Sequence, residues 1–410
     1  MKGLLEGLRV VEGSAFVAAP LAGMTMAQLG ADVIRFDPPR GGLDARRWPL
    51  TDKGKSIYWA GLNKGKRSIA VDTRRPEGQE IVSALITAPG PGNGIFLTNF
   101  PVTGWLSYET LKRRRRDLIM LNLLGNSDGS SAVDYTVNCA VGVPFSTGPE
   151  RDGGRDPVNN ALPAWDLATG MMAALGLVAA ERHRSRTGEG QLVKLALSDV
   201  ALAMIGNLGY IGESTVNGAD RPATGNHLYG AYGSEFVTKD RRYAYVVAIT
   251  ERMWSELVKA TGSGESMGVI AATRGVNLDK SEGARFEARK EITAALKPWF
   301  AERTLDEIKA AFAGTGVCWG PYQTVTQMLE EDPRATAVNP MLAMIQQPGI
   351  GSYLAPGTPL DFSAAPRLGP QPAPALGQHT DEILSGLLGM SDGQIGKLRD
   401  DKIVAGPVEL

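Results

Sequence analysis

The sequence predicts an α/β protein with a large, doubly wound parallel sheet and a smaller central α+β domain. Short runs rich in Val, Ile and Leu alternate with helical stretches from residue 8 to residue 123, which is typical of repeated strand–helix–strand units. Such units need right-handed crossovers, so their strands should be parallel. Gly, Asn and Tyr replace the aliphatic runs at residues 217–233, and this shift indicates where a second domain begins.

The first strand–helix–strand unit carries most of this prediction. A strand at residues 8–12 precedes a helix that begins near Pro20 and ends at Gly30, and a strand at 31–37 stops at Pro38. The later elements are strands at 67–72, 94–99, 117–123 and 192–197 and helices at 76–87, 166–183 and 198–204. Ligands of such sheets bind beyond the carboxyl ends of the strands. The polar residues expected there are Glu12, Asp37, Asp72 and Asn99.

Three segments follow from these patterns. Residues 1–216 are the first part of the large domain, 217–328 form the small domain, and 329–410 return to complete the large domain. The small domain should hold one clear strand, and it should be surrounded by charged helices; the strand is 243–249 and the helices are 251–261, 284–300 and 304–312. Repeated prolines make the return segment extended, so it must lie on another part of the chain.

Composition excludes several classes of function. Lys and Arg total 43 against 44 Asp and Glu, so no global positive field favours nucleic acid or an anionic membrane. Two cysteines, Cys139 and Cys318, and three histidines are too few for a zinc ribbon or a disulfide framework. Both thiols lie among apolar neighbours and are expected to be buried. Without a signal peptide or a membrane-length apolar stretch, the protein is expected to be cytoplasmic and free of metal.

Local motifs leave one residue of interest. No phosphate-binding glycine loop, dinucleotide fingerprint or serine-hydrolase elbow is present. Asp166 stands at the predicted start of a helix, where the dipole would hold its carboxylate ionised. It is either an ordinary helix cap or a carboxylate nucleophile toward an activated acyl group, and the sequence alone leaves both open.

Basic residues gather after the second and third predicted strands, where a phosphate-bearing ligand would sit. They are Arg40, Arg46, Arg47, Lys64, Lys66, Arg67, Arg74 and Arg75. A solvated basic face is the ordinary alternative. The run at 113–116 is interpreted in that way, since cations are favoured at helix carboxyl ends.

Ordered motifs over nearly the whole chain resemble the family III CoA-transferases. They lie at 4–11, 29–35, 63–69, 98–100, 165–166, 186–191 and 376–384. The resemblance implies a Rossmann-like large domain built from both termini, a small central domain and an interlaced homodimer. It also implies an acyl-CoA substrate, no permanently bound cofactor, and neither nucleic acid nor membrane as a partner.

The same resemblance assigns residues. Asp166 would attack the thioester and then carry CoA as an aspartyl thioester, with adjacent backbone N–H groups stabilising the oxyanions. The implied CoA contacts are Val17, Ala18, Arg40, Val71, Asp72, Thr73, Arg74, Asn99, Phe100, Pro101, Val133 and Asp134. Many relatives carry an arginine where Pro38 stands, and Arg40 is its suggested substitute. Val133 replaces the histidine that racemases of the family use, so racemisation loses a proton carrier.

Segments 9–21, 59–67, 160–166 and 347–354 most resemble family members that move CoA between the two carboxyl groups of mesaconate, a reaction of a carbon-fixation (3-hydroxypropionate) cycle. Mesaconyl-C1-CoA would become mesaconyl-C4-CoA, with the diacid held in place. Transfer to a free dicarboxylate is the alternative, and an inactive CoA-binding protein is a third reading that the presence of Asp166 disfavours. Arg46, Arg47 and His227 are candidates for gripping the free carboxylate.

Overall fold

A computed structural model describes residues 3–150 and 156–407. These residues group into two compact units. Unit 1 contains 3–141, 160–209 and 333–407, and unit 2 contains 142–150, 156–159 and 210–332. The expected domain borders at 216/217 and 328/329 remain predictions.

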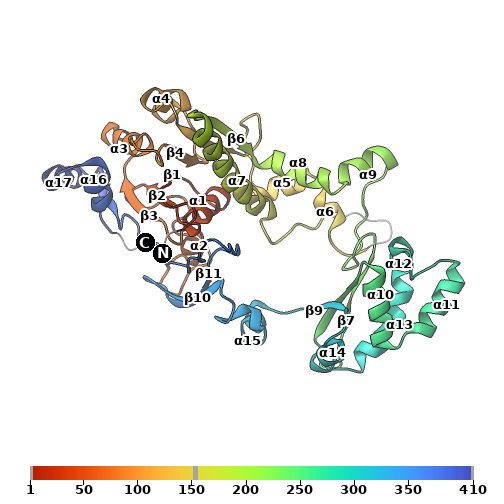
Figure 1. The fold of residues 1–410 in the computed structure, drawn as a ribbon. Coiled ribbons are helices and arrows are strands. Elements are labelled where there is room, and N and C mark those ends of the chain that lie inside the picture. The colour runs from red at the N-terminus through yellow and green to blue at the C-terminus, as the bar shows by residue number, and fades with distance from the viewer. Residues whose placement is uncertain (1–2, 151–155, 408–410) are drawn as a thin grey trace. The chain divides into compact units, whose positions relative to one another are not determined.

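Unit 1 is built on a seven-stranded sheet with the order β12-β3-β2-β1-β4-β5-β6 (Figure 1). Its strands are β1 (Arg9–Gly13), β2 (Asp32–Asp37), β3 (Arg67–Val71), β4 (Ile95–Thr98), β5 (Ile119–Leu124), β6 (Leu192–Ala196) and β12 (Val404–Ala405). All neighbouring pairs are parallel except β12 with β3. The prediction of a large parallel sheet is therefore confirmed. The strand order reverses between β1 and β4, and this is the position where open parallel sheets bind ligands.

Helices cover both faces of this sheet because its strands are apolar on both sides. Val10 packs toward the face covered by α1 and α7, and its neighbour Val11 packs toward the opposite face. The first-face helices are α1 (Ala18–Gln28) and α7 (Ala164–Thr187). The opposite-face helices are α3 (Pro76–Ile86), α4 (Tyr108–Arg114), α16 (Thr380–Leu388) and α17 (Asp392–Asp400). Gly170 lets α7 approach α1 closely, since a Cβ there would lie 2.8 Å from the Ala18 carbonyl oxygen.

The return segment 333–407 is less extended than its prolines predicted. It contains a hairpin of β10 (Leu342–Gln347) and β11 (Gly351–Pro356), followed by α16, α17 and β12. The Gly377 N–H donates to the Ser68 hydroxyl of β3 at 2.9 Å, which ties the segment to the sheet. The remaining elements of unit 1 are α2 (Ile57–Leu62), η1 (Gly104–Leu106), α5 (Asp134–Ala140), α8 (Leu197–Asn207) and η2 (Pro333–Ala335).

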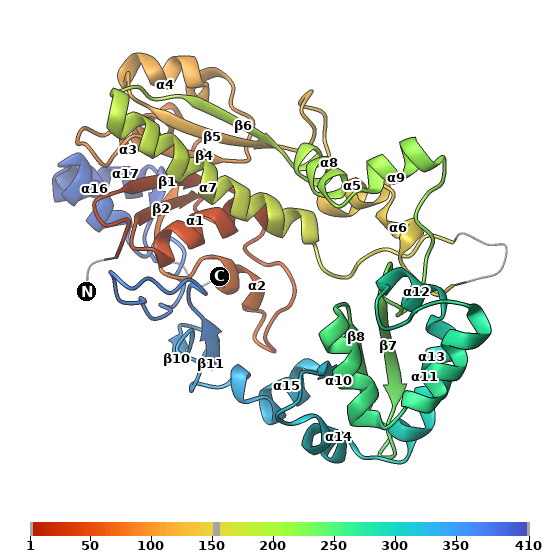
Figure 2. The same cartoon turned by 45° about the vertical axis from the view of Figure 1, so that its right-hand side comes forward.

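Unit 2 contains an antiparallel sheet with helices beside it (Figure 2). Aromatic and aliphatic side chains of these elements form its own core. The sheet contains β7 (Tyr232–Val237), β8 (Tyr243–Ala248) and β9 (Cys318–Pro321). Only β8 was predicted, because β7 and β9 lack a run of branched residues. The helices are α6 (Val143–Ser146), α9 (Tyr210–Asn217), α10 (Glu251–Thr261), α11 (Gly264–Arg274), α12 (Glu282–Glu287), α13 (Arg289–Ala301), α14 (Leu305–Phe312) and α15 (Val325–Glu331).

One sequence expectation about side chains is wrong. Cys139 and Cys318 are both free and exposed, although their apolar neighbours suggested buried thiols. Cys139 lies on α5 and Cys318 begins β9, and the neighbours along the chain turn to other sides. Within the described ranges, no helix is long and apolar enough to cross a membrane.

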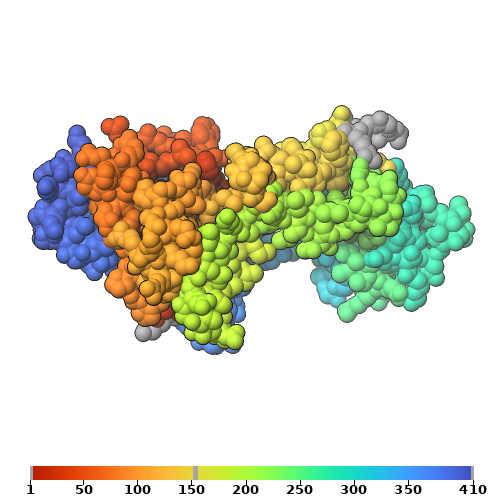
Figure 3. All heavy atoms as spheres, turned by 90° about the horizontal axis from the view of Figure 1, so that it is seen from above, coloured from red at the N-terminus to blue at the C-terminus, as the bar shows by residue number. Residues whose placement is uncertain are grey.

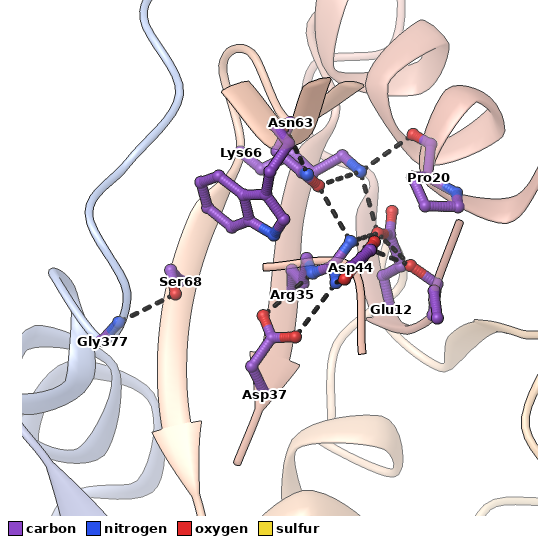
Figure 4. A network of polar contacts seen from close by, with 12 residues as sticks. Glu12, Pro20, Arg35, Asp37, Asp44, Asn63, Lys66, Ser68 and Gly377 are labelled. Carbon is purple, nitrogen blue, oxygen red and sulfur yellow. Dashed lines mark hydrogen bonds and ion pairs between the residues drawn. The ribbon is translucent and has the colours of Figure 1, made fainter. Parts of the chain in front are cut away.

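A cluster of buried charges ties β1, β2 and the following loops together (Figure 4). The Arg35 guanidinium on β2 donates to both carboxylate oxygens of Asp37, at 2.9 and 3.0 Å. It also donates to Asp44 Oδ1 at 2.9 Å. Because an unpaired buried charge costs several kcal/mol, these contacts constrain the loop that carries Asp44.

A second cation completes the cluster. Lys66 Nζ donates to Glu12 Oε1 at 2.8 Å, to the Pro20 carbonyl oxygen at 2.8 Å and to Asn63 Oδ1 at 2.9 Å. Burial lowers the pKa of Lys66 to about 8, although Glu12 opposes the shift. We refer to Glu12, Arg35, Asp37, Asp44 and Lys66 as the ion cluster.

Gly23 should be required by the ion cluster. A Cβ at this position would lie 1.6 Å from Glu12 Oε2, so Gly23→Ala must displace a buried carboxylate from its lysine. We expect a loss of about 3 kcal/mol in the free energy of unfolding, measured by urea denaturation. Gly386→Ala on α16 is the control, because a Cβ there meets no atom within 4 Å. Equal unfolding midpoints for the two variants would contradict this role of Gly23.

Candidate active site

A cavity of about 560 Å³ lies beyond the carboxyl ends of β2, β3 and β4 in unit 1. Aromatic and apolar groups dominate its wall, among them Phe36, Leu43 and Trp105. Thr73, Phe100 and Pro101, which the sequence had assigned to CoA binding, also line it. A mostly apolar cavity of this size at the edge of a parallel sheet suits an extended organic ligand.

Asp166 lies in the first turn of α7, but it does not cap the helix. The Asp134 side chain, at the start of α5, accepts hydrogen bonds from the backbone N–H groups of Trp165 at 2.8 Å and Asp166 at 3.0 Å. The alternative of Asp166 as a plain cap is therefore wrong. The Asp166 carboxylate remains available for chemistry.

The electrostatics of Asp166 differ from the sequence expectation. Burial raises the pKa of the Asp166 carboxyl to about 6, the negative charge of Asp134 acts in the same direction, and Arg47 opposes them. The helix dipole was expected to keep the group strongly ionised, but desolvation outweighs that effect. Near neutral pH the carboxylate is still mostly ionised and is poorly solvated, as a nucleophile requires.

The same contacts correct the expected oxyanion site. The N–H groups of Trp165 and Asp166 already donate to Asp134, and Leu167 N–H donates to the Pro163 carbonyl oxygen at 3.1 Å. These backbone groups beside Asp166 are therefore occupied. Other donors must stabilise negative charge that develops near this carboxylate.

The loop after β1 is held in a strained conformation beside the strand reversal. Asn99, which follows β4, accepts from Ala15 N–H at 3.0 Å and donates to the Ala15 carbonyl oxygen at 2.8 Å. Phe16 has a φ of +71°, which a non-glycine residue adopts only when its surroundings enforce it. Its N–H donates to Asp44 Oδ2 at 3.1 Å, so the ion cluster enforces this backbone.

Two further side chains accompany Asp166. The Arg47 guanidinium lies 5.3 Å from the ring centres of both Phe16 and Tyr58. Burial raises the pKa of Tyr58 to about 12, with Arg47 opposing and Asp166 adding to the shift. Its hydroxyl is buried and has no hydrogen-bond partner in the described part of the chain. A protonated hydroxyl without a partner is a ready donor to a ligand.

The structure brings together only some of the predicted site residues. Val17 and Ala18 are buried at the start of α1, and the Val71 side chain is in the core, so the Val71 side chain cannot face a ligand. Asp72 pairs with the exposed Arg74 at 2.7 Å. Two other predicted CoA contacts are exposed: Arg40 lies in the loop after β2, and Val133 precedes α5. His227, a candidate for binding the free carboxylate, belongs to unit 2.

Sequence reasoning missed Tyr58 and Asp44, because no local pattern marks either residue. Arg47 was named among the basic residues and, with Arg46 and His227, as a candidate for gripping the free carboxylate of the substrate. Among the described residues, no group of three or more His, Cys, Asp or Glu side chains could hold a metal ion. The candidate site therefore consists of a carboxylate, an arginine and a tyrosine, and none of these three residues is among those that line the cavity.

Comparisons with known proteins agree with this architecture. The sequence profile of CoA-transferase family III matches residues 5–380. The chain is 60% identical over 408 residues to 2-methylfumaryl-CoA isomerase of Chloroflexus aurantiacus, with 99% of each protein aligned. It is 28% identical over 412 residues, 98% of each protein, to succinyl-CoA–D-citramalate CoA-transferase of the same organism.

A solved structure gives the same result for the fold. The crystal structure of a CAIB/BAIF family protein from Brucella suis matches with a TM-score of 0.78 and 27% identity, covering 94% of this chain and 100% of that one. The profile spans most of the chain, and the first relative spans nearly all of it. The chain therefore belongs to CoA-transferase family III.

Proposed function

We propose that the protein is a 2-methylfumaryl-CoA isomerase. It would move CoA from one carboxyl group of mesaconate (2-methylfumarate) to the other, converting mesaconyl-C1-CoA into mesaconyl-C4-CoA. The observation that carries this proposal is the 60% identity with the isomerase over 99% of both chains. Transfer to a free dicarboxylate is the alternative, and the 28% identity with the citramalate transferase supports it less strongly.

Asp166 is the proposed nucleophile. Its carboxylate oxygen attacks the thioester carbonyl, the C–S bond breaks, and CoA thiolate leaves, so that Asp166 and mesaconate are joined as a mixed anhydride. The thiolate attacks the aspartyl carbonyl, which releases mesaconate and leaves CoA as a thioester on Asp166. The second carboxylate of mesaconate then attacks that thioester, and the two steps run in reverse. No net proton or electron is exchanged.

The large cavity is the proposed site of the CoA moiety. Thr73, Phe100 and Pro101 line it, and its position beyond the strand ends agrees with where such sheets bind nucleotides. Arg40 follows the lining residue Pro38 closely, and Arg74 follows Thr73 directly. We therefore propose that these two exposed arginines meet the phosphates of CoA.

A homodimer is proposed on the basis of an apolar surface on unit 1. Helices α7 and α8 expose large hydrophobic residues, and Figure 3 shows the yellow-green part of the chain that carries these helices at the surface. They are Met171, Met172, Leu175, Val178 and Leu202. Such a face is typical of an interface, and a second copy in the interlaced arrangement of the family is the proposed occupant.

Labelled substrate tests the proposed reaction. Mesaconyl-C1-CoA is incubated with ¹³C-labelled free mesaconate, and we expect the C4 isomer to form without label because the released diacid stays bound. Labelled product would instead establish the intermolecular alternative. Asp166→Ala should lower turnover by at least ~10³-fold, since it removes the nucleophile. A variant with full turnover would exclude the mechanism.

The raised pKa of Asp166 predicts an acid limb in the pH–rate profile. Only the ionised carboxylate attacks, so kcat/KM should be constant above pH about 7 and should fall below pH about 6. Asp134→Asn removes the negative charge that raises this pKa but keeps a capping side chain. The limb should therefore move to lower pH, and a limb that stays in place would show that another group titrates.

The cavity assignment predicts a charge effect at Leu43, which lines the cavity and is 80% exposed. Leu43→Glu should raise KM for the CoA thioester about 10-fold with little change in kcat, because its charge repels the phosphates. Added salt should reduce the effect. Leu43→Gln is the matched control without charge, and equal KM values for the two variants would place CoA elsewhere.

The dimer predicts a molecular mass of twice 43.6 kDa in sedimentation equilibrium. Leu175→Glu on α7, where the side chain is 61% exposed, should shift the equilibrium toward the monomer by burying a charge in the interface. A monomeric wild-type protein would contradict the proposal.

A further inference from the structure

This inference depends on the proposed reaction. That reaction needs free mesaconate to stay bound, and the covalent steps at Asp166 do not ensure this. When CoA is on Asp166, mesaconate is no longer covalently attached and could diffuse away. It must stay in the site, turn, and present its second carboxylate. A group that holds a carboxylate without reacting with it is therefore needed close to Asp166.

We propose that Arg47, assisted by the Tyr58 hydroxyl, holds the mesaconate carboxylate that does not react and so keeps the transfer intramolecular. Arg47 lies over the rings of Phe16 and Tyr58, and its charge acts on Asp166. These contacts use the faces of the rings, and within residues 3–150 and 156–407 no acceptor takes a hydrogen bond from the Arg47 guanidinium. Such a planar fork binds a carboxylate through two parallel hydrogen bonds.

Arg47 is exposed, whereas the two cations of the ion cluster are buried and already have partners. Arg35 donates to Asp37 and Asp44, and Lys66 donates to Glu12, Pro20 and Asn63. Arg47 makes no ion pair with any residue in the described ranges. Arg47, the cation whose charge acts on Asp166, therefore keeps its capacity to bind an anion.

Tyr58 supplies an independent sign of a ligand. Its hydroxyl is buried without a partner, which costs about 1–3 kcal/mol unless a bound molecule satisfies it. The ring that carries this hydroxyl lies 5.3 Å from the Arg47 guanidinium, and the charge of Asp166 adds to the raised pKa of Tyr58. A substrate carboxylate bound to Arg47 can accept this hydrogen bond too.

Charge balance explains why one arginine serves every step. Before transfer, the negative charges are the Asp166 carboxylate and the free carboxylate of mesaconyl-CoA. After transfer, Asp166 is a neutral thioester and mesaconate carries both charges. The total beside Arg47 is unchanged, so the cation can hold either carboxylate as the diacid turns. Bidentate binding is symmetrical and does not distinguish the two.

We refer to Arg47 and Tyr58 as the carboxylate clamp, and the fold fixes the backbone of a ring that packs against it. Phe16, one of the two rings beside Arg47, keeps its strained backbone because Asp44 accepts its N–H. Asp44 in turn is held by Arg35 in the ion cluster. A fixed arginine loses less conformational freedom when it binds, so more of its binding energy retains the diacid.

The test is the partition of product between retained and external mesaconate. Mesaconyl-C1-CoA is incubated with an excess of ¹³C-mesaconate, and the label in the C4 isomer and the free unlabelled mesaconate are both measured. Arg47→Gln should lower isomerisation at least ~100-fold, and most of the product it still forms should carry label. Arg47→Lys, which restores the charge but not the fork, should incorporate less label than Arg47→Gln.

Two controls separate a clamp from a structural role. Arg116→Gln changes an exposed arginine after α4 and should match the wild type. Tyr58→Phe removes only the hydroxyl and should increase release of free mesaconate several-fold. A purely structural defect lowers the rate without changing the fraction of labelled product. The positive charge of Arg47 lowers the pKa of Asp166. Arg47→Gln removes this charge and should therefore move the acid limb of the pH–rate profile to higher pH.

The outcomes distinguish this inference from the proposed function. If the wild-type protein forms no C4 isomer, the proposed function is wrong, and the inference about Arg47 is wrong as well. If neither the wild type nor Arg47→Gln incorporates label into the C4 isomer, the proposed function stands and only the role of Arg47 is wrong. If Arg47→Gln forms labelled product and the wild type does not, the result supports both the proposed function and the role of Arg47.

Discussion

The pairing of Arg35 with Asp37 and Asp44 inside unit 1 is the interaction on which the site depends. A buried guanidinium must be neutralised and hydrogen-bonded, so the loop carrying Asp44 has to return to the end of β2. Asp44 then holds Phe16 in its strained conformation, and Phe16 contacts Arg47. The contacts that neutralise Arg35 therefore also help to position Arg47, whose positive charge acts on Asp166.

Opposing effects set the reactivity of that carboxylate. Desolvation and Asp134 raise its pKa to about 6, and Arg47 limits the rise. Asp134 has two effects, because it also accepts the N–H groups that begin α7. A carboxylate with a lower pKa would be a weaker nucleophile, and one with a higher pKa would be protonated at neutral pH. The arrangement gives an ionised but poorly solvated group.

Much of unit 1 could be predicted because its signals are local. The strands β1 to β6 have runs of aliphatic residues, and some helices carry local signals, such as Pro76 at the start of α3 and Gly188 at the end of α7. Elements without such runs were missed, including β7 and β9, and the proline-rich segment concealed the β10–β11 hairpin. The exposed Cys139 and Cys318 show that apolar neighbours in sequence do not predict burial in space.

The sequence by itself determined the parallel sheet, the family resemblance and the position of Asp166, because these depend on short patterns that each segment carries alone. Only the tertiary structure decided that Asp134 caps α7, that Val71 turns into the core, and that the Arg47 guanidinium packs against the ring of Tyr58. These residues come from separate loops and helices. Their distances, burial and charge interactions arise only when the sheet brings the segments together, and no local pattern encodes them.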